Sequence, residues 1–405
     1  MSEKELIPQL YRTEFRKLAS VLCRSFGLEY MELAEDIVSE TFLLAAETWG
    51  INGLPDNPVA WLYAVAKNRA KDQLKRNAIF QNKIIPSLQQ NDDREPEVDL
   101  SQQNIADSQL QMMFAICHPC NPPEAQIGLS LRILCGFGID EIADAFLTNK
   151  ENINKRLFRA RQKLKEAKIE IALPPAAEID KRTENVLTTL YLLFNEGYYS
   201  KSKNVVLRRD LCLEAMRLTY LLIENPATDK PFVNALLALM CFHASRFDAR
   251  VARNGELVLY DDQDISLWNR DLMEKGNYYL NKAATGDEIS TYHFEAAIAY
   301  WHTTRSDDRW ENILQLYNKL LQLNYSPIAA LNRTYALGKV YGKAMAIAEA
   351  EKLNLGKDHL YHVLLGDLYT GVDREKALSH LNTALKLTKS PVDRKSILNK
   401  ISKLG

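Results

Sequence analysis

The stretch GIDEIADAFLTNKENINKRLFRARQKLKEA, residues 138–167, decides the fold that we predict for the middle of the chain. Residues 138–146 have the pattern of a short helix, residues 147–150 form a break, and a long basic helix follows from about Glu151. A short helix, a tight turn and a second helix make up a helix-turn-helix, whose second helix lies in the major groove of DNA. The stretch therefore predicts a helical DNA-binding domain.

The predicted second helix has two faces. At 100° per residue, an apolar stripe holds Ile153, Leu157, Ala160 and Leu164. A second stripe lies roughly 110° away, and with the adjacent Lys155 it holds the candidate DNA-binding residues: Asn152, Lys155, Arg156, Arg159 and Lys163. Arginine reads guanine and asparagine reads adenine, whereas lysine mostly contacts phosphate. Taken alone, this helix also fits a solvated basic face; the short helix and turn before it favour DNA. Arg161 and Lys165 point elsewhere, which favours a structural or phosphate-contact role.

Length and composition are those of a soluble, helix-rich protein. The 405 residues exceed one compact core and predict about two to four domains. Hydrophobic residues make up 46% and charged residues 25% of the chain, and glycine (16) and proline (14) are scarce. No apolar run approaches the roughly 20 residues of a membrane span, and the N-terminus does not resemble a secretory signal. We therefore expect a cytoplasmic, all-α protein whose six cysteines are free thiols, mostly buried.

The N-terminal part predicts helices around a polar loop. Apolar periodicity indicates helices at Leu10–Phe26 and Met31–Trp49. Gly50–Pro58 is rich in Gly, Pro and Asn and predicts a loop. Another helix should follow, with Asn57 as its N-cap and Pro58 in its first turn, and run to about Arg76.

The helix after this loop carries a cationic ridge, because Lys67, Lys71 and Lys75 recur every four residues. Leu62, Val65, Ala66, Ala70 and Leu74 are expected to form its buried face. A basic ridge beside aromatic side chains and a polar loop suits single-stranded DNA, and the loop is a natural pocket for an extruded base. The candidate residues are Asn52, Asp56, Asn57, Trp61, Lys67, Asn68, Lys71 and Lys75. The alternative is a solvated helix with a core tryptophan.

The helix before the loop has a different surface. Asp36, Glu40, Leu43 and Glu47 share one face, which is acidic with an apolar spot. Such a face repels DNA and suits a basic protein partner, although in isolation it also fits ordinary solvated surface. The overall net charge of −1 argues against a nucleic-acid binder, so the prediction depends on this local distribution of charge.

We predict four segments: residues 1–80, a linker at 81–107 rich in polar residues, a helix-turn-helix domain at 108–173, and a helical domain at 178–405. In the last segment, Leu365–Pro391 and, less clearly, Pro327–Leu353 show the small/large alternation of tetratricopeptide helix pairs. Such pairs stack, because one pair cannot bury its apolar face alone.

Two clusters invite a metal interpretation that we do not favour. Cys117-His118-Pro119-Cys120 is only part of a tetrahedral zinc site and has no second pair to complete it, so a helix-ending turn with packed thiols is preferred. Asp261, Asp262 and Asp264 lack the glycine and bidentate glutamate of a calcium loop, so a capping and domain-contact role is preferred. Catalytic signatures are also absent. We therefore expect no metal, no cofactor and no enzymatic activity.

At these residues the chain resembles the extracytoplasmic-function group of bacterial sigma factors. LAEDIVSETFLLAAETWGINGLPDNPVAWLYAVAKNRAKDQLKRN, residues 33–77, is similar to the second conserved region of that family, with Ser39 for the usual Gln and Lys67 for the usual Arg. CHPCNPPEAQIGLSLRILCGFGIDEIADAFLTNKENINKRLFRARQKLKEA, residues 117–167, resembles the fourth region. LYLLFNEGYY, DDQDISLWNRDLMEKG, YHFEAAIAYWH and SPIAALNRTYALG resemble the subgroup with a C-terminal tetratricopeptide-like extension.

The resemblance implies a role for each surface. Asp36 and Glu40, with Leu43 and Glu47 on the same face, would bind core RNA polymerase at the clamp of its largest subunit, and the fourth region would meet the flap. The Gly50–Asn57 loop and the next helix would melt and hold the minus-ten promoter element. The helix after Lys150 would read the minus-thirty-five element, and the linker would thread into the polymerase. The extension would regulate. Because Phe194–Tyr198 and Trp268–Arg270 lie outside the repeats, we expect them to form the inner surface where the extension meets the sigma domains.

Two other functions remain open. The chain could be a one-component regulator that binds an operator, with the helical array as its sensor, or a tetratricopeptide scaffold with vestigial DNA-binding helices. A repressor needs neither the acidic face at Asp36 and Glu40 nor the ridge after Trp61. The intact basic stripe of the second helix argues against a vestigial domain.

Overall fold

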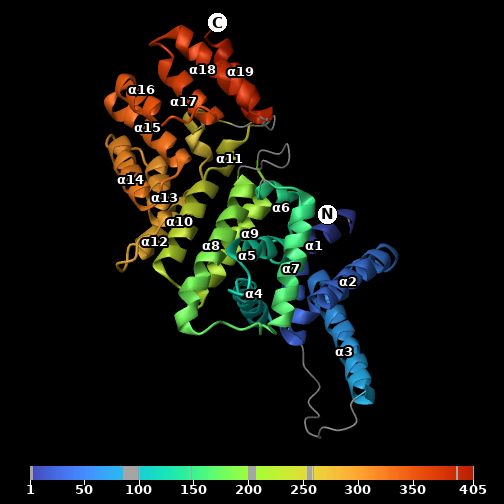
Figure 1. The fold of residues 1–405 in the computed structure, drawn as a ribbon. Coiled ribbons are helices and arrows are strands. Elements are labelled where there is room, and N and C mark those ends of the chain that lie inside the picture. Colours follow the sequence, from blue (N-terminus) through green and yellow to red (C-terminus); the bar gives the residue numbers. More distant parts are fainter. Residues whose placement is uncertain are drawn as a thin grey trace. The chain divides into compact units, whose positions relative to one another are not determined.

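The structure is a computed structural model that describes residues 3–84, 99, 101–146, 148–198, 207–252, 258, 260–388 and 391–404. Over these residues it contains nineteen α-helices and three short 3-10 helices and no β-strand, which confirms the predicted all-α class (Figure 1). In this part of the chain, no helix is both long and apolar enough to cross a membrane. The chain divides into two compact units, Met1–Leu192 and Leu193–Gly405, hereafter unit 1 and unit 2.

Unit 1 begins with helices α1 (Glu3–Phe26), α2 (Met31–Asn52) and α3 (Pro58–Ile84), which contact one another. Their interface buries apolar side chains at helical spacing, among them Leu18, Leu22, Val38, Ala45, Leu62 and Ala66. Helix α2 runs past Trp49, so the prediction that Gly50–Asn52 belongs to the loop is wrong. The helix ends at Gly53, whose φ of 83° favours glycine and whose N–H donates to Trp49 O at 3.0 Å. The loop is therefore residues 53–57.

The remaining helices of unit 1 are α4 (Gln102–Ile116), α5 (Pro123–Ile133), α6 (Ile139–Ala145), α7 (Lys150–Glu166) and the start of α8 (Ala176–Tyr198). Helix α4 begins inside the predicted linker 81–107, and α3 also extends into it, to Ile84. The polar first turn of α4 concealed its start, because the apolar periodicity begins only at Ile105. The N-cap is Ser101, whose Oγ accepts a hydrogen bond from Asn104 N at 3.3 Å.

The two halves of unit 1 touch. Helix α1 packs on α4, and Arg24 Nη1 donates to Asn104 Oδ1 at 2.8 Å. On another edge, Arg161 Nη1 of α7 lies 3.9 Å from Glu32 Oε1 of α2. The helices before and after the predicted linker therefore belong to one folded body.

Unit 2 begins with the end of α8 and continues through α9 (Arg209–Glu224), α10 (Pro231–Ala244), α11 (Phe247–Arg250), α12 (Arg270–Ala283) and α13 (Thr291–Thr303). Helix α10 is buried on nearly all sides and packs against α9, α12 and α13. Helix α12 approaches it closely at Gly276, where an added Cβ would lie 2.7 Å from the ring of Phe242. The packing of α10 against these helices forms the central core of unit 2.

The chain then stacks α14 (Arg309–Leu323), α15 (Pro327–Tyr341), α16 (Lys343–Lys352), α17 (His359–Tyr369), α18 (Arg374–Leu387) and α19 (Pro391–Ser402), each in contact with the next (Figure 1). Helix pairs stand at both predicted repeats, α15/α16 and α17/α18. Small residues let the helices of each pair approach: Gly338 faces Ala346, and Gly366 faces Leu381.

Replacing Gly366 with valine should destabilise this array by about 1–3 kcal/mol, because a bulky side chain is forced into a packed interface. A Cβ at Gly366 would lie 2.7 Å from Leu381 Cδ2 and Cγ. Urea unfolding measures the loss. Gly356→Val is the matched control, since a Cβ there meets nothing within 4 Å; equal stability of the two variants would contradict the prediction.

Candidate nucleic-acid interface

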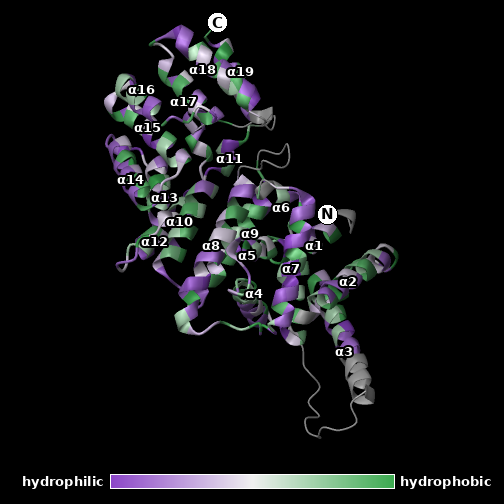
Figure 2. Ribbon diagram, in the orientation of Figure 1, coloured by the Kyte–Doolittle hydropathy of each residue, from purple (hydrophilic) through white to green (hydrophobic). Residues whose placement is uncertain are grey.

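Helix α7 has the two faces that its sequence predicts. The Asn149 side chain caps it by accepting a hydrogen bond from Asn152 N at 2.9 Å. The apolar stripe is buried, which confirms the prediction for Ile153, Leu157, Ala160 and Leu164. Figure 2 shows hydrophobic and hydrophilic segments alternating along α7, as expected for an amphipathic helix. An ion pair of 2.6 Å between Lys150 Nζ and Asp140 Oδ1 joins α7 to α6, the first helix of the predicted motif.

The cationic stripe is mostly open to solvent. Asn152, Lys155, Arg159 and Lys163 are exposed. Arg156 is partly buried, with its guanidinium carbon 5.4 Å from the ring centroid of Phe146, which lies in the turn before α7. This cation–π contact fixes the guanidinium near the start of the helix. Arg159, which carries no such contact, is therefore the freest arginine of the stripe.

The other side of α7 holds one residue with the expected structural role and one that the sequence analysis passed over. Arg161 is partly buried and faces Glu32, which agrees with the structural role expected for it. Phe158 is 71% exposed although it is a large apolar side chain. The sequence already indicated that Phe158 is exposed, because a phenylalanine outside the apolar stripe of an amphipathic helix must face solvent or a partner.

The acidic face of α2 is formed as predicted: Asp36, Glu40, Leu43 and Glu47 are all exposed. Glu40 forms an ion pair with Arg69 of α3, a residue that the sequence analysis assigned to no surface. The pair joins the acidic face to the helix that carries the cationic ridge. Asp36 makes no such ion pair with the described residues, and its carboxylate is exposed on the same face.

The loop between α2 and α3 ends at the predicted N-cap. Asn57 Oδ1 accepts a hydrogen bond from Ala60 N at 3.0 Å, which confirms the cap. Asp56 and Asn57 are exposed in the loop, and Asn52 is exposed at the end of α2. The three side chains thus surround the short loop, although they come from two elements.

The position of Trp61 fits both sequence interpretations, a core tryptophan and a ring at the surface that could contact DNA. Its ring packs edge-on against Trp49, with 5.4 Å between ring centroids, and Trp49 is buried. Trp61 itself stays partly exposed. The contact fixes the orientation of the Trp61 ring, and part of that ring remains at the surface next to the loop.

The cationic ridge of α3 is only partly described. Lys67 and Lys71 are partly exposed and Asn68 is exposed, whereas the Lys75 and Leu74 side chains lie outside the described residues. The buried face is confirmed at Leu62, Ala66 and Ala70, and Val65 is partly buried. On the same side of the domain, Tyr63 is buried and donates a hydrogen bond of 2.7 Å to Glu14 Oε2 of α1, which ties α3 to α1.

The cysteine-rich turn is used for packing. Cys117 is buried with its Sγ 3.9 Å from Ser130 Oγ, and burial raises the pKa of this thiol to about 12. Cys120 N donates to His118 Nδ1 at 3.2 Å. Burial lowers the pKa of His118 and raises that of Cys120. Across the described residues, no three His, Cys, Asp or Glu side chains gather in the manner of a metal site.

One aspartate of unit 2 caps a helix, as expected, and another makes contacts within the unit, while the expected contact between domains stays a prediction. Asp264 Oδ1 accepts from Ser266 N at 2.9 Å and caps the 3-10 helix Ile265–Leu267. Asp261 Oδ2 accepts from Tyr335 Oη at 3.1 Å and lies 3.8 Å from Lys339 Nζ, both on α15. Phe194 and Tyr198 lie in the interior of unit 2, where their rings stack at 5.9 Å.

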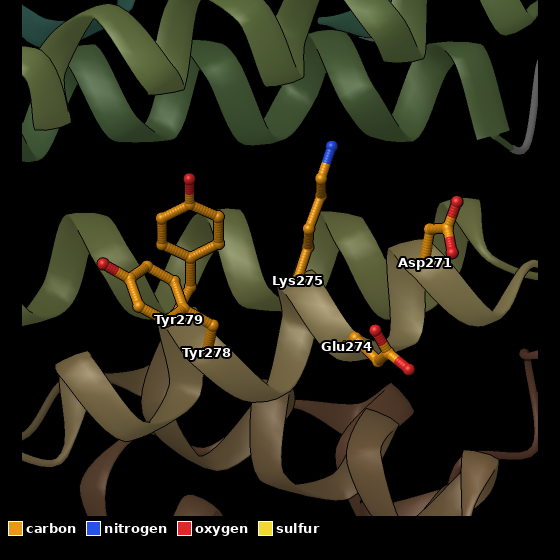
Figure 3. Close-up of a pocket in the computed structure, with 5 residues that line it drawn as sticks. All are labelled: Asp271, Glu274, Lys275, Tyr278 and Tyr279. Carbon is orange, nitrogen blue, oxygen red and sulfur yellow. The ribbon is translucent and has the colours of Figure 1, made fainter.

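Unit 2 also has a surface hollow on α12, with a volume of about 440 Å³. Figure 3 shows the lining residues: Asp271, Glu274, Lys275, Tyr278 and Tyr279. Lys275 and Tyr279 extend toward the same neighbouring helices, whereas Glu274 points away from them. Its mixed charges and open shape indicate no particular ligand.

Comparisons with known proteins agree with the N-terminal geometry. Residues 10–79, which cover almost all of α1–α3, match the sigma-70 region 2 family. Residues 182–284 match a family of unknown function, DUF6596. An uncharacterized protein of Rhizobium meliloti (strain 1021) is 34% identical over 356 residues, which span 85% of this chain and 83% of that protein. The chain belongs to the family of this protein. No solved structure matches it.

The sigma-70 region 2 match makes this chain a sigma-factor-like protein. The acidic face of α2, the loop and the described part of the α3 ridge all lie within the matched residues 10–79. Helix α7 lies between the two matched ranges. In this sigma-factor-like protein, the case for α7 as a DNA-reading helix therefore depends on its own geometry.

Proposed function

We propose that the chain is an RNA polymerase sigma factor of the extracytoplasmic-function type. The observation that carries the proposal is helix α7, with its apolar stripe buried and its cationic stripe exposed, in a chain whose first helices match sigma-70 region 2. A partner for each surface follows from its charge. The acidic α2 face binds core polymerase, and the cationic helices bind promoter DNA.

In this proposal the protein acts by positioning, and the polymerase performs the chemistry. The loop at residues 53–57, with Asn52, Trp61 and the Lys67, Asn68, Lys71 and Lys75 ridge, opens and holds the minus-ten element. Phosphate contacts by the lysines set the register, and the fixed Trp61 ring offers a stacking surface for an unpaired base. Helix α7 reads the minus-thirty-five element. Unit 2, with its tetratricopeptide-like helix pairs, regulates.

Run-off transcription with purified core polymerase and the full chain tests the proposal. Core polymerase supplied with the chain should start RNA synthesis at defined promoter positions that core polymerase alone does not use. The one-component regulator predicts a different outcome: operator binding without core polymerase and no change of start site. A chain that neither binds core polymerase nor changes start sites would overturn the proposal.

Arg159→Ala should weaken promoter selection by about 1–3 kcal/mol if Arg159 reads a base. The side chain is exposed in the middle of the cationic stripe, so its removal costs little stability. Competition binding between matched and mismatched minus-thirty-five sequences measures the effect. Lys165→Ala, which is also exposed on α7 but outside the stripe, is the control. An equal loss of affinity for every DNA sequence would mark Arg159 as a phosphate contact instead.

A further inference from the structure

Arg246, between α10 and α11, is a buried cation with uncharged partners. Its side chain is 8% exposed. Its Nη2 donates to Tyr198 Oη at 3.4 Å and to His243 Nδ1 at 3.2 Å, and its guanidinium carbon lies 5.3 Å from the Tyr260 ring centroid. Its Nε is buried and has no hydrogen-bond partner. In the part of the chain that the structure describes, no carboxylate pairs with it.

Tyr260 also contacts a second set of buried polar groups that lack hydrogen-bond partners. The Tyr260 hydroxyl donates to His302 O, and the two rings meet at 5.0 Å. The buried His302 Nδ1 has no hydrogen-bond partner. His302 also contacts Trp310 at 5.7 Å, and the guanidinium carbon of Arg309 lies 5.0 Å from the Trp310 centroid, with its buried Nε again without a partner. We call Arg246, Arg309, His243 and His302 the cationic cluster.

Among the described residues, no carboxylate forms an ion pair with either arginine of the cluster. A guanidinium only donates hydrogen bonds, so His243 Nδ1 is the acceptor and the His243 ring is neutral. Burial, followed by the charges of Arg246 and Arg309, lowers the pKa of His302 to about 3, and no carboxylate opposes this shift. Buried arginines are rare unless paired, because removing the charge from water is costly. A bound anion would supply the missing charge and the missing acceptors.

We propose that unit 2 binds a small oxyanion, a carboxylate or a phosphate, at the cationic cluster. Guanidinium groups recognise planar or tetrahedral oxyanions through charged N–H donors, and here Arg246 Nε is one donor that is available. The surrounding rings of Tyr198, Tyr260 and Trp310 exclude water, which strengthens the attraction between the ion and the cluster. The cluster residues come from α10, the segment after it, α13 and the start of α14, so a bound ion joins these elements.

Thermal unfolding of the full chain tests the proposal. Sodium phosphate and sodium benzoate are titrated separately, each against sodium chloride at equal ionic strength. At a hundredfold excess over the dissociation constant, the ion that fits should raise the melting temperature of unit 2 by roughly 5–10 °C. A response to phosphate alone or to benzoate alone identifies the class of ligand. If neither phosphate nor benzoate raised the melting temperature more than chloride does, the proposal would be overturned.

Arg246→Met separates this site from general salt effects. Methionine keeps much of the length and removes the charge, so the variant should bind the ion at least tenfold more weakly. Without ion, its melting temperature should be equal to or higher than that of the parent, because an unpaired buried charge is gone. Arg270→Met, at an exposed position on α12, is the matched control and should respond like the parent.

Arg309→Met provides a second variant in case Arg246→Met does not fold. It should weaken the response to the same ion, since Arg309 belongs to the cluster but lies at the start of a different helix. A full response of either folded variant to the ion would rule out the cluster as the binding site. Because the readout is stability, the result does not depend on the proposed role in transcription.

Discussion

Asp36→Lys is expected to weaken binding to core RNA polymerase by about 10- to 100-fold. The Asp36 side chain is exposed on the acidic face of α2, and placing a cation there sets like charges against a basic partner, at a cost of about 1.4–2.8 kcal/mol. Asp36 is a better choice than Glu40, whose loss would also release Arg69 from its ion pair. Fluorescence anisotropy of the labelled chain, titrated with core polymerase at fixed salt, gives the affinity.

The control for this experiment is Asp72→Lys. Asp72 is exposed on α3 and not on the helix that carries the acidic face, and the substitution makes the same change of charge. It should leave the affinity for core polymerase nearly unchanged. Equal affinities of the two variants would show that the α2 face is ordinary solvated surface, which is the alternative that the sequence left open.

Lowering the pH from 7.5 to 5.5 is expected to destabilise unit 2 by about 3 kcal/mol. Burial lowers the pKa of His302 to about 3 and that of His243 well below its usual value, and neighbouring arginines lower both further. In the unfolded chain both imidazoles titrate near 6.5. The folded state therefore keeps its full stability above that pH and loses about 1.4 kcal/mol per imidazole by pH 5.5, because unfolding takes up the protons.

Urea unfolding at several pH values in this range measures how the free energy of unfolding depends on pH. The lowered pKa values of Asp264, Asp308 and Glu349 act only at more acidic pH. Burial also lowers the pKa values of His293 and His380, which add to the loss of about 3 kcal/mol from His302 and His243. His302→Gln should remove about 1.4 kcal/mol of the dependence. A free energy of unfolding that stays constant from pH 7.5 to 5.5 would contradict neutral, buried imidazoles.

Local periodicity was sufficient to predict the elements of the candidate DNA interface. The stripe at Ile153 and Leu157 and the Asn57 cap follow from spacing and residue type within a few positions. The errors lie at element ends, where weak signals compete. Gly50 suggested a loop, but the chain continues as helix to Asn52, and the polar first turn of α4 concealed the start of that helix.

The contacts that could not be predicted from the sequence join residues that are far apart along the chain. Glu40 and Arg69, or Trp49 and Trp61, meet only because α2 and α3 pack together. The cationic cluster is a stronger case: Arg246 and His302 come from separate helices, and nothing in the local pattern of either marks an anion site. Such sites depend on tertiary packing, which residue spacing does not encode.

The hydrogen bond from Arg24 to Asn104 and the approach of Arg161 to Glu32 give unit 1 a further property. While these contacts hold, the loop near Trp61 and the stripe on α7 move as parts of one rigid object. Such an object reaches two sites on a duplex only at a set separation and a set rotation about the helix axis. Since B-DNA turns once in about 10–10.5 base pairs, each base pair added between the sites turns one away from the other by about a tenth of a turn. Under the proposed function, the protein would thus measure the length of DNA between its two promoter elements as well as their sequence.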